Sequence, residues 1–229
     1  MVNAAGSGET GPTLTVADLE RALAISYAPA PVQAALTALF ALDATLGTIL
    51  KTTREPMVGQ MRLTWWYEAL GRLDTAPPPA EPTLQALALT VLPHVPGSRL
   101  ARIAEGWEAL LETPLEAAAV ERFAQGRGAA LFGAAACILA VEDPRIATAG
   151  EGWALADLSR RLSDTARAAA IAEQARARLD AALSGRWPRR GRTLGALALL
   201  ARADIAKAGA PAGSPARVGR MLLHRLVGY

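Results

Sequence analysis

Apolar residues recur at helical spacing along most of the chain, and prolines and capping residues separate the segments that carry them. Thr15, with Asp18 three residues later, has the spacing of a capping box and predicts the start of a first helix. Pro31 and Pro56 each stand where a first-turn proline begins a helix, and the helix from Pro31 should run to about Leu50. The pattern therefore predicts helices in the first third of the chain.

The rest of the chain is punctuated in the same way. Prolines within 77–82 exclude a helix interior, so this segment should be an extended linker. The run Thr113-Pro114-Leu115-Glu116 combines an N-cap, a first-turn proline and a capping-box glutamate, and predicts a long Ala-rich helix to about residue 141. The other helices are expected at about 83–92 and 98–111, after 143–144, on both sides of a basic loop at 186–192, and from 214 to about 227.

Composition points to the same class of fold. The chain has 229 residues, of which 52% are hydrophobic and only 5% aromatic, and helix formers such as Ala and Leu dominate. We expect an all-α protein with one helical domain at 13–229, preceded by a flexible segment at 1–12. Residues 1–12 lack the basic start and apolar core of a secretory signal, and the apolar run 128–141 is too short to span a bilayer, so we expect a cytoplasmic location.

Common cofactor and nucleic-acid signatures are missing from the sequence. Cys137 is the only cysteine, which excludes an internal disulfide and a cysteine-based zinc site. His94 and His224 lie far apart without metal-ligand spacing, and there is no G-x-G-x-x-G or Walker pattern. The basic residues are dispersed and no recognised binding motif accompanies them, so we expect no nucleic-acid partner.

Two neighbouring segments carry a known signature. Residues 55–66 read Glu-Pro-Met-Val-Gly-Gln-Met-Arg-Leu-Thr-Trp-Trp, and residues 39–42 read Leu-Phe-Ala-Leu. Together they resemble the second and third helices of the squalene/phytoene synthase family. The resemblance implies an isoprenoid-synthase-type helical bundle around a central cavity. It also marks a set of candidate groove or structural residues, namely Phe40, Arg62, Trp65, Trp66 and Arg160.

Active members of that family, as the resemblance implies, bind magnesium through two D-x-x-x-D motifs, whose i, i+4 spacing puts both carboxylates on one helix face. Alignment by the flanking residues places the first motif at Gly47 and Lys51 and the second at Arg161 and Thr165. None of these four residues is acidic. The sequence therefore predicts a non-catalytic relative without catalytic residues, metal or other cofactor.

Asp157 and Asp164 are the remaining metal candidates near the second motif. A displaced magnesium site is one interpretation, and it would make the protein a magnesium-dependent prenyl-diphosphate transferase for head-to-head condensation. A solvated or ion-paired helix face is the favoured interpretation, because several arginines surround these residues and Arg161 would repel magnesium. We expect the central cavity, if open, to be apolar and free of a magnesium cluster.

The helix that begins at Pro56 leaves two interpretations open. Trp65, with Met61 on the same face, is typical of core packing, and the alternative is a prenyl-binding wall. Arg62 stands between apolar neighbours, so we expect it to form a buried or groove-facing ion pair with Glu55 or with an acidic residue of another helix.

The resemblance also indicates partners. A phytoene-synthase-like branch of the family, which includes a mitochondrial assembly factor for respiratory complex I, lacks the aspartates and retains the segment at 55–66. It implies a binding or assembly role here, with a subunit of a respiratory complex as partner. The loop 186–192 and the arginines of the last helix, including Arg217, indicate a partner or an anionic membrane surface at the inner membrane face, since Trp187 suits an interfacial position. An ordinary solvated loop is the alternative.

Overall fold

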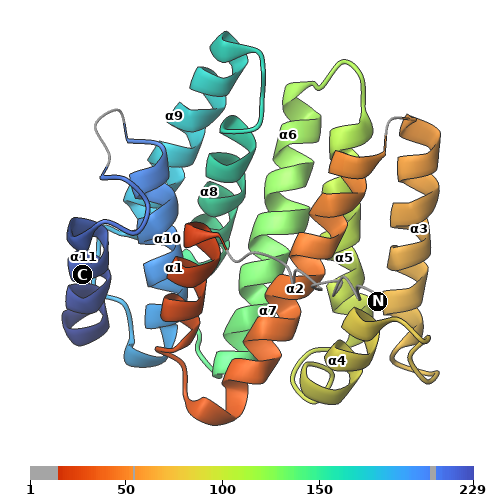
Figure 1. The fold of residues 1–229 in the computed structure, drawn as a ribbon, viewed down its shortest axis with the longest axis horizontal. Helices are drawn as coiled ribbons and strands as arrows, with labels where there is room; N and C mark the ends of the chain where they lie inside the picture. Colours follow the sequence, from red (N-terminus) through yellow and green to blue (C-terminus); the bar gives the residue numbers. More distant parts are fainter. Residues whose placement is uncertain (1–14, 54, 207–209) are drawn as a thin grey trace, which may run out of the picture.

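The computed structural model describes residues 15–53, 55–206 and 210–229, and these residues form helices and no β-strand (Figure 1). The all-α class predicted from composition is confirmed. The flexible segment expected at 1–12 lies outside the described residues. In chain order the α-helices are α1 (Val16–Ile25), α2 (Ala30–Thr52), α3 (Pro56–Arg72), α4 (Pro82–Thr90), α5 (Gly97–Glu108), α6 (Ala117–Phe123), α7 (Ala130–Leu139), α8 (Arg145–Ser159), α9 (Thr165–Ala182), α10 (Arg192–Asp204) and α11 (Pro215–Val227).

Short helical segments of other types complete the set. Two are 3-10 turns, η1 (Ala109–Leu111) and η3 (Arg189–Gly191), and η2 (Ala124–Ala129) is a π-helix. The π-helix joins α6 to α7, so that residues 117–139 run as one long helix through the molecule (Figure 1). This helix ends at Ala140, whose left-handed backbone (φ 48°) terminates it.

Most of the predicted helix starts are present. Thr15 and Asp18 form both hydrogen bonds of the capping box before α1. Prolines occupy the first turn of α2, α3 and α11 as predicted, and also that of α4, which begins at Pro82, the last residue of the expected linker. The start predicted at Pro114 is wrong: α6 begins at Ala117, because Glu116 (φ −82°, ψ 167°) is still extended and serves as the N-cap residue.

The helices lie roughly side by side, from α3 at one edge through α5, α2 and the α6–η2–α7 helix to α8, with α9, α10 and α11 at the other edge (Figure 1). Leucines of α2 are completely buried among them, at positions 36, 39, 42 and 46. By length and composition alone, α2 could also cross a membrane. Its burial here identifies it as a core helix, and it supplies one wall of the site described next.

Candidate functional site

A cavity of about 400 Å³ opens between α1, α2, α8 and α10. Three of the four positions aligned with the magnesium motifs line it: Gly47 and Lys51 from α2, and Arg161 just beyond α8. The fourth, Thr165, is the first residue of α9 and is not part of the lining. The structure therefore brings the two aligned segments together across one cavity, as the resemblance implies.

Half of the residues that line the cavity are charged, so the expectation of an apolar cavity was wrong. Basic and acidic side chains alternate around it, and most of them are paired with one another. The charged lining residues are Arg21, Lys51, Arg127, Arg160, Arg161, Arg217, Asp18, Glu20, Asp43, Asp157 and Asp204.

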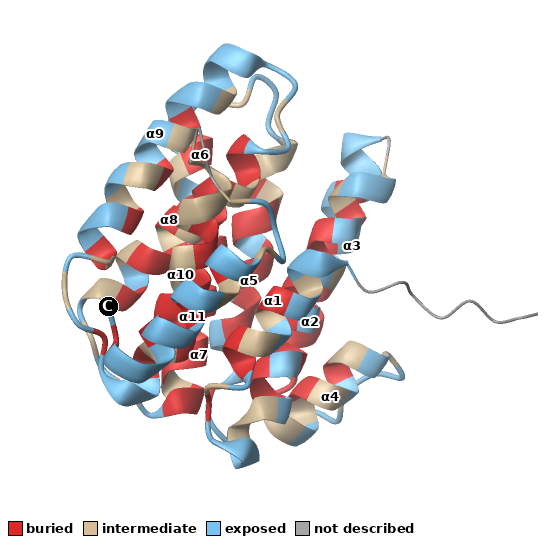
Figure 2. Cartoon of the chain, turned by 60° about the vertical axis from the view of Figure 1, so that its left-hand side comes forward, coloured by how far each residue is buried: buried red, intermediate tan, exposed pale blue. Residues whose placement is uncertain are grey.

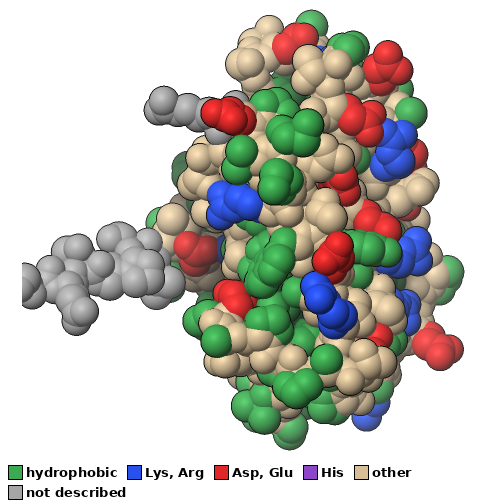
Figure 3. All heavy atoms as spheres, turned by 90° about the vertical axis from the view of Figure 1, so that its right-hand side faces the viewer, with side chains coloured by type: hydrophobic (Ala, Val, Ile, Leu, Met, Phe, Trp, Pro, Cys, Tyr) green, Lys and Arg blue, Asp and Glu red, His purple; other side chains and the backbone are tan. Residues whose placement is uncertain are grey.

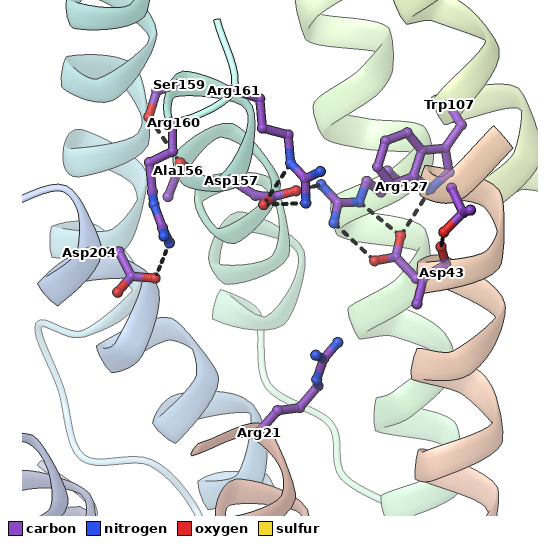
Figure 4. Close-up of polar contacts among 12 residues, drawn as sticks. Arg21, Asp43, Trp107, Arg127, Ala156, Asp157, Ser159, Arg160, Arg161 and Asp204 are labelled. Carbon is purple, nitrogen blue, oxygen red and sulfur yellow. Dashed lines mark hydrogen bonds and ion pairs between the residues drawn. The ribbon is translucent and has the colours of Figure 1, made fainter. Parts of the chain in front are cut away.

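Arg127 lies at the centre of these pairs (Figure 4). Its Nε and Nη2 donate to the two carboxylate oxygens of Asp43, at 2.8 and 2.9 Å, in a bidentate arrangement. Its Nη1 donates to Oδ2 of Asp157 at 2.6 Å. One guanidinium thus bridges α2 and α8 across the cavity.

Aromatic rings enclose the same guanidinium. The Arg127 Cζ lies 4.2 Å from the ring centroid of Trp107 and 4.5 Å from that of Trp153. The indole N–H of Trp107 also donates to Oδ1 of Asp43, at 3.0 Å. Cation–π contacts and charge-assisted hydrogen bonds therefore stabilise a cation that has almost no contact with water.

Glycines at two helix crossings place Arg127 where it is. A Cβ atom on Gly106 of α5 would lie 2.2 Å from the Arg127 nitrogen, and one on Gly128 would lie 2.3 Å from the carbonyl oxygen of Gly150 in α8. The backbones of α5, η2 and α8 therefore touch directly on both sides of Arg127. The π-helical turn η2 lies at this point of closest approach, and such turns are frequent at functional sites.

Electrostatics keep both members of the Arg127–Asp157 pair charged. Burial disfavours the charged form of Arg127, but the charges of Asp43 and Asp157 outweigh it and raise the pKa of Arg127 above its ordinary value. For Asp157 burial alone would raise the pKa, whereas Arg127 and then Arg161 lower it further than burial raises it. Two carboxylates and two guanidinium groups make this part of the cavity neutral, with no surplus of negative charge for a divalent cation.

The residues present do not fit magnesium, the metal that active members of the family bind. Both oxygens of Asp157 are engaged, Oδ2 by Arg127 and Oδ1 by Arg161 at 2.8 Å, and Asp43 is engaged in the same way. Asp164 does not meet Asp157: it caps α9 by accepting from the Arg167 N–H at 3.0 Å and is not part of the cavity lining. In the described ranges no cluster of three metal-ligating side chains occurs.

The position of the first aligned carboxylate is also closed sterically. A Cβ atom on Gly47 would lie 2.9 Å from Cη2 of Trp107, the ring that covers Arg127. An aspartate there would have to displace this ring. Glycine at position 47 therefore leaves the space that the Trp107 ring needs in order to cover Arg127.

Arg160 belongs to a second ion-pair network at the other end of the cavity. It donates to Asp204 at 2.7 Å, and Asp204 also accepts from Arg217 at 2.6 Å. Arg217 in turn holds Glu20 of α1 at 2.8 Å. Arg217 is therefore buried in ion pairs and does not add to the basic surface of α11, contrary to the sequence-based interpretation.

Sequence reasoning missed Arg127, Asp43 as its partner, and the Glu20–Arg217 pair. A signal existed for each. Arg127 stands between two glycines in an Ala-rich helix, and Asp43 and Glu20 stand among apolar positions of their helices. A charged residue in such surroundings is buried only when it is paired. Each of these residues therefore indicated a partner of opposite charge elsewhere in the chain, without identifying it.

The structure buries a different set of α3 residues from the set that the sequence predicted. The buried face consists of Gly59, Leu63, Trp66, Ala69 and Leu70, and it packs on α5. Trp66 is 6% exposed and Phe40 of α2 is buried as well, whereas Trp65 is 43% exposed. Core packing of Trp65 and Met61 is therefore a wrong prediction, because consecutive residues on a helix point about 100° apart.

Arg62 is also exposed, which contradicts the expected buried ion pair. Its Nη1 donates to the hydroxyl groups of Thr52 and Thr53 at the end of α2, at 3.4 and 3.2 Å. It therefore ties the start of α3 to α2 without a carboxylate. Trp187, by contrast, is fully buried and lies against Gly191 and Gly195, so it does not take the interfacial position expected of it.

Comparison with known proteins identifies one family. The family model described as squalene/phytoene synthase matches residues 14–172, the part of the chain that contributes α1, α2, Arg127 and α8 to the cavity. No curated protein and no solved structure matches the chain significantly.

Proposed function

The chain belongs to the squalene/phytoene synthase family, and we propose that it is a non-catalytic member that acts as a binding or assembly factor. The observation that carries the proposal is the position of Arg127 between Asp43 and Asp157. The Arg127 guanidinium occupies the space between α2 and α8 in which, as the resemblance implies, an active member of the family would hold magnesium.

The chemistry of the family gives this observation its weight. An allylic diphosphate ionises only when cations compensate the departing diphosphate, and magnesium held by carboxylates supplies that charge. In this chain one fixed guanidinium pairs with the two nearest carboxylates, and Arg161, which also pairs with Asp157, supplies the second positive charge that neutralises them. The carboxylates stabilise the fold instead of presenting metal to a substrate.

The alternative is a transferase with displaced acidic ligands, and the geometry does not favour it. It would need Asp157 and Asp164 to face one metal. Asp164 caps the first turn of α9, and Asp157 is held by two arginines.

An exposed apolar surface on α3 supports a role in protein binding. Met57, Val58, Met61 and Trp65 recur at helical spacing on the side of α3 that faces away from α5, and they are solvent exposed. Figure 3 shows hydrophobic side chains gathered over this edge of the molecule. Methionine and tryptophan are enriched at protein interfaces. We call these four residues the α3 stripe and propose that it contacts the partner, which the resemblance to the complex I branch suggests is a respiratory complex subunit.

Two experiments test the proposal. Purified protein incubated with magnesium and farnesyl or geranylgeranyl diphosphate should form no squalene or phytoene, and formation of either product would overturn the non-catalytic assignment. Deletion of the gene should lower the amount of assembled NADH:quinone oxidoreductase and leave isoprenoid products unchanged. Normal complex I with loss of isoprenoid product would support the transferase instead.

Complementation of the deletion separates the α3 stripe from the fold. A Met61→Ser/Trp65→Ser variant should fold normally, since both residues are exposed, and should fail to restore the complex. Leu89→Ser, which changes an exposed leucine of α4, is the matched control and should restore it. Equal rescue by both variants would show that the α3 stripe is not the contact surface.

A further inference from the structure

The last helix, α11, carries apolar residues on both of its sides. Met221 and His224 are buried against the rest of the molecule. On the opposite side Leu222, Leu223 and Leu226 are 44%, 56% and 73% exposed. α11 lies on the outside of the molecule, with much of its outer side coloured as exposed in Figure 2. No packing requirement of the fold explains three exposed leucines on one turn and a half of helix.

Arginines border this outer face. Arg220 and Arg225 lie on α11 itself, one on either side of the leucines by helical geometry, and both are exposed. The loop before α10 meets the carboxyl end of the helix: Arg186 Nε donates to the carbonyl oxygen of Val227 at 2.8 Å, and the Trp187 N–H donates to that of Gly228 at 2.7 Å. This contact brings Arg186 to the carboxyl end of α11.

The charges of these arginines are not compensated by acidic residues. Within 15–53, 55–206 and 210–229, no carboxylate lies within 4.0 Å of the exposed arginines at 186, 189, 190, 220 and 225. Their partners are neutral groups, such as the Val227 carbonyl for Arg186 and the Tyr27 ring for Arg225. The arginines around the cavity, by contrast, are paired with acidic residues, whereas the charges of Arg186, Arg220 and Arg225 stay uncompensated on and beside α11.

An apolar helix face bordered by unpaired arginines has the chemistry of an interfacial helix. Aliphatic side chains enter the boundary between headgroups and acyl chains, while arginines at the flanks extend their guanidinium groups to lipid phosphates. A second copy of the chain is a poor occupant of the same face, because antiparallel docking of two α11 helices would bring their arginines together. Charge complementarity therefore favours an anionic surface as the partner of this face.

We propose that the outer face of α11, with Leu222, Leu223 and Leu226 flanked by Arg220 and Arg225, docks the protein on a membrane that contains anionic phospholipid. The proposal is independent of the non-catalytic role, since the face lies outside the cavity and away from the α3 stripe. It also differs from the sequence-based interpretation, because Trp187 and Arg217 are buried and take no part in it.

Co-sedimentation of the full chain with vesicles tests the proposal. The protein should sediment with vesicles of phosphatidylcholine and phosphatidylglycerol in equal parts, should stay in solution with pure phosphatidylcholine, and should be released by high salt. Leu223→Ser/Leu226→Ser and Arg220→Gln/Arg225→Gln should each weaken binding by about tenfold or more. All four residues are exposed, and thermal unfolding shows whether each variant keeps its fold.

Matched controls identify the surface. Leu89→Ser alters an equally exposed leucine (79%) on α4, and Arg102→Gln/Arg167→Gln removes two exposed charges elsewhere; both should bind as the wild type does. A wild-type protein that stays in solution with both kinds of vesicle would overturn the proposal, as would equal losses in the α11 and control variants. Sedimentation equilibrium that shows a dimer abolished by Leu223→Ser/Leu226→Ser would assign the face to self-association instead.

Discussion

The Arg127 guanidinium lies in a bidentate pair with the Asp43 carboxylate, at 2.8 and 2.9 Å, and the two side chains are only 4% and 5% exposed. Removal of two charges from water is costly, and the cost is offset only when the remaining hydrogen-bonding groups are satisfied. Here Asp157, the Trp107 N–H and two aromatic faces satisfy them. The pair therefore joins α2 to η2, Asp157 links both to α8, and neither Arg127 nor Asp43 can be lost alone without leaving a buried charge.

The first prediction concerns this pair. Arg127→Met should lower the free energy of unfolding by about 3–5 kcal/mol, because it leaves the buried Asp43 carboxylate uncompensated. Urea unfolding followed by circular dichroism measures the change. Arg161→Gln, at the exposed end of the same network, is the control and should cost no more than about 1 kcal/mol. Similar losses in the two variants would contradict the central role of Arg127.

A partner substitution should rescue part of the loss. In Asp43→Asn/Arg127→Met the stranded charge is gone, so the double variant should be more stable than Arg127→Met alone although it has lost one more native side chain. The same urea experiment tests this, and a strictly additive double variant would show that the two residues do not interact in solution.

The third prediction is a dependence of stability on pH that arises from His224. Burial lowers the pKa of His224, the carbonyl of Tyr229 raises it less, and the charge of Arg192 lowers it further, so that the net shift is downward from 6.5. Well above pH 6.5 the ring is neutral in both the folded and the unfolded chain, and its contribution to stability is complete. Below that pH the unfolded chain takes up a proton first, and stability falls until the pH passes the lower pKa of the folded state.

Unfolding experiments at several pH values measure this effect. The free energy of unfolding should fall between about pH 7.5 and pH 5.5, and His224→Gln should show a smaller fall over the same range. His94→Gln changes the other histidine, which is exposed, and should keep the wild-type dependence. A smaller fall in His94→Gln than in the wild type would contradict the assignment of the pH dependence to His224.

The fourth prediction compares the stability cost of replacing the two adjacent tryptophans of α3. Trp66→Ala should cost about 3–5 kcal/mol because it leaves a cavity between α3 and α5, whereas Trp65→Ala should cost about 1 kcal/mol or less because half of its ring is already in water. Thermal unfolding compares the two variants directly. A larger loss in Trp65→Ala would mean that Trp65 belongs to the core after all.

The last prediction tests the helix crossing beside Arg127. Gly128→Ala should destabilise the protein by about 1–3 kcal/mol or more, because the new methyl group meets the Gly150 carbonyl and must push α8 away. Gly71→Ala, at a helical glycine with open space around it, should instead be neutral or stabilise by about 0.5 kcal/mol. Urea unfolding of both variants checks the contrast, and equal effects would show that the crossing tolerates separation.

Local chemistry along the chain determined a large part of the structure. The Thr15–Asp18 capping box and the first-turn prolines of α2, α3, α4 and α11 set helix starts because their hydrogen bonds and backbone angles involve only neighbouring residues. The family resemblance also aligned Gly47 and Lys51 with one magnesium motif and Arg161 with the other, and all three line one cavity, since a family relation carries the arrangement of helices with it.

Tertiary structure decided which charges meet and which faces are covered. Arg127 and Asp43 are 84 residues apart, and Arg217 and Glu20 are 197 apart, so no local rule links them. Trp65 and Trp66 have the same composition around them, and only the position of α5 decides that one is buried and the other exposed. A helix sequence specifies its own start and its apolar residues, but the partner of a buried charge depends on how other helices cross it, and that is a property of the folded chain alone.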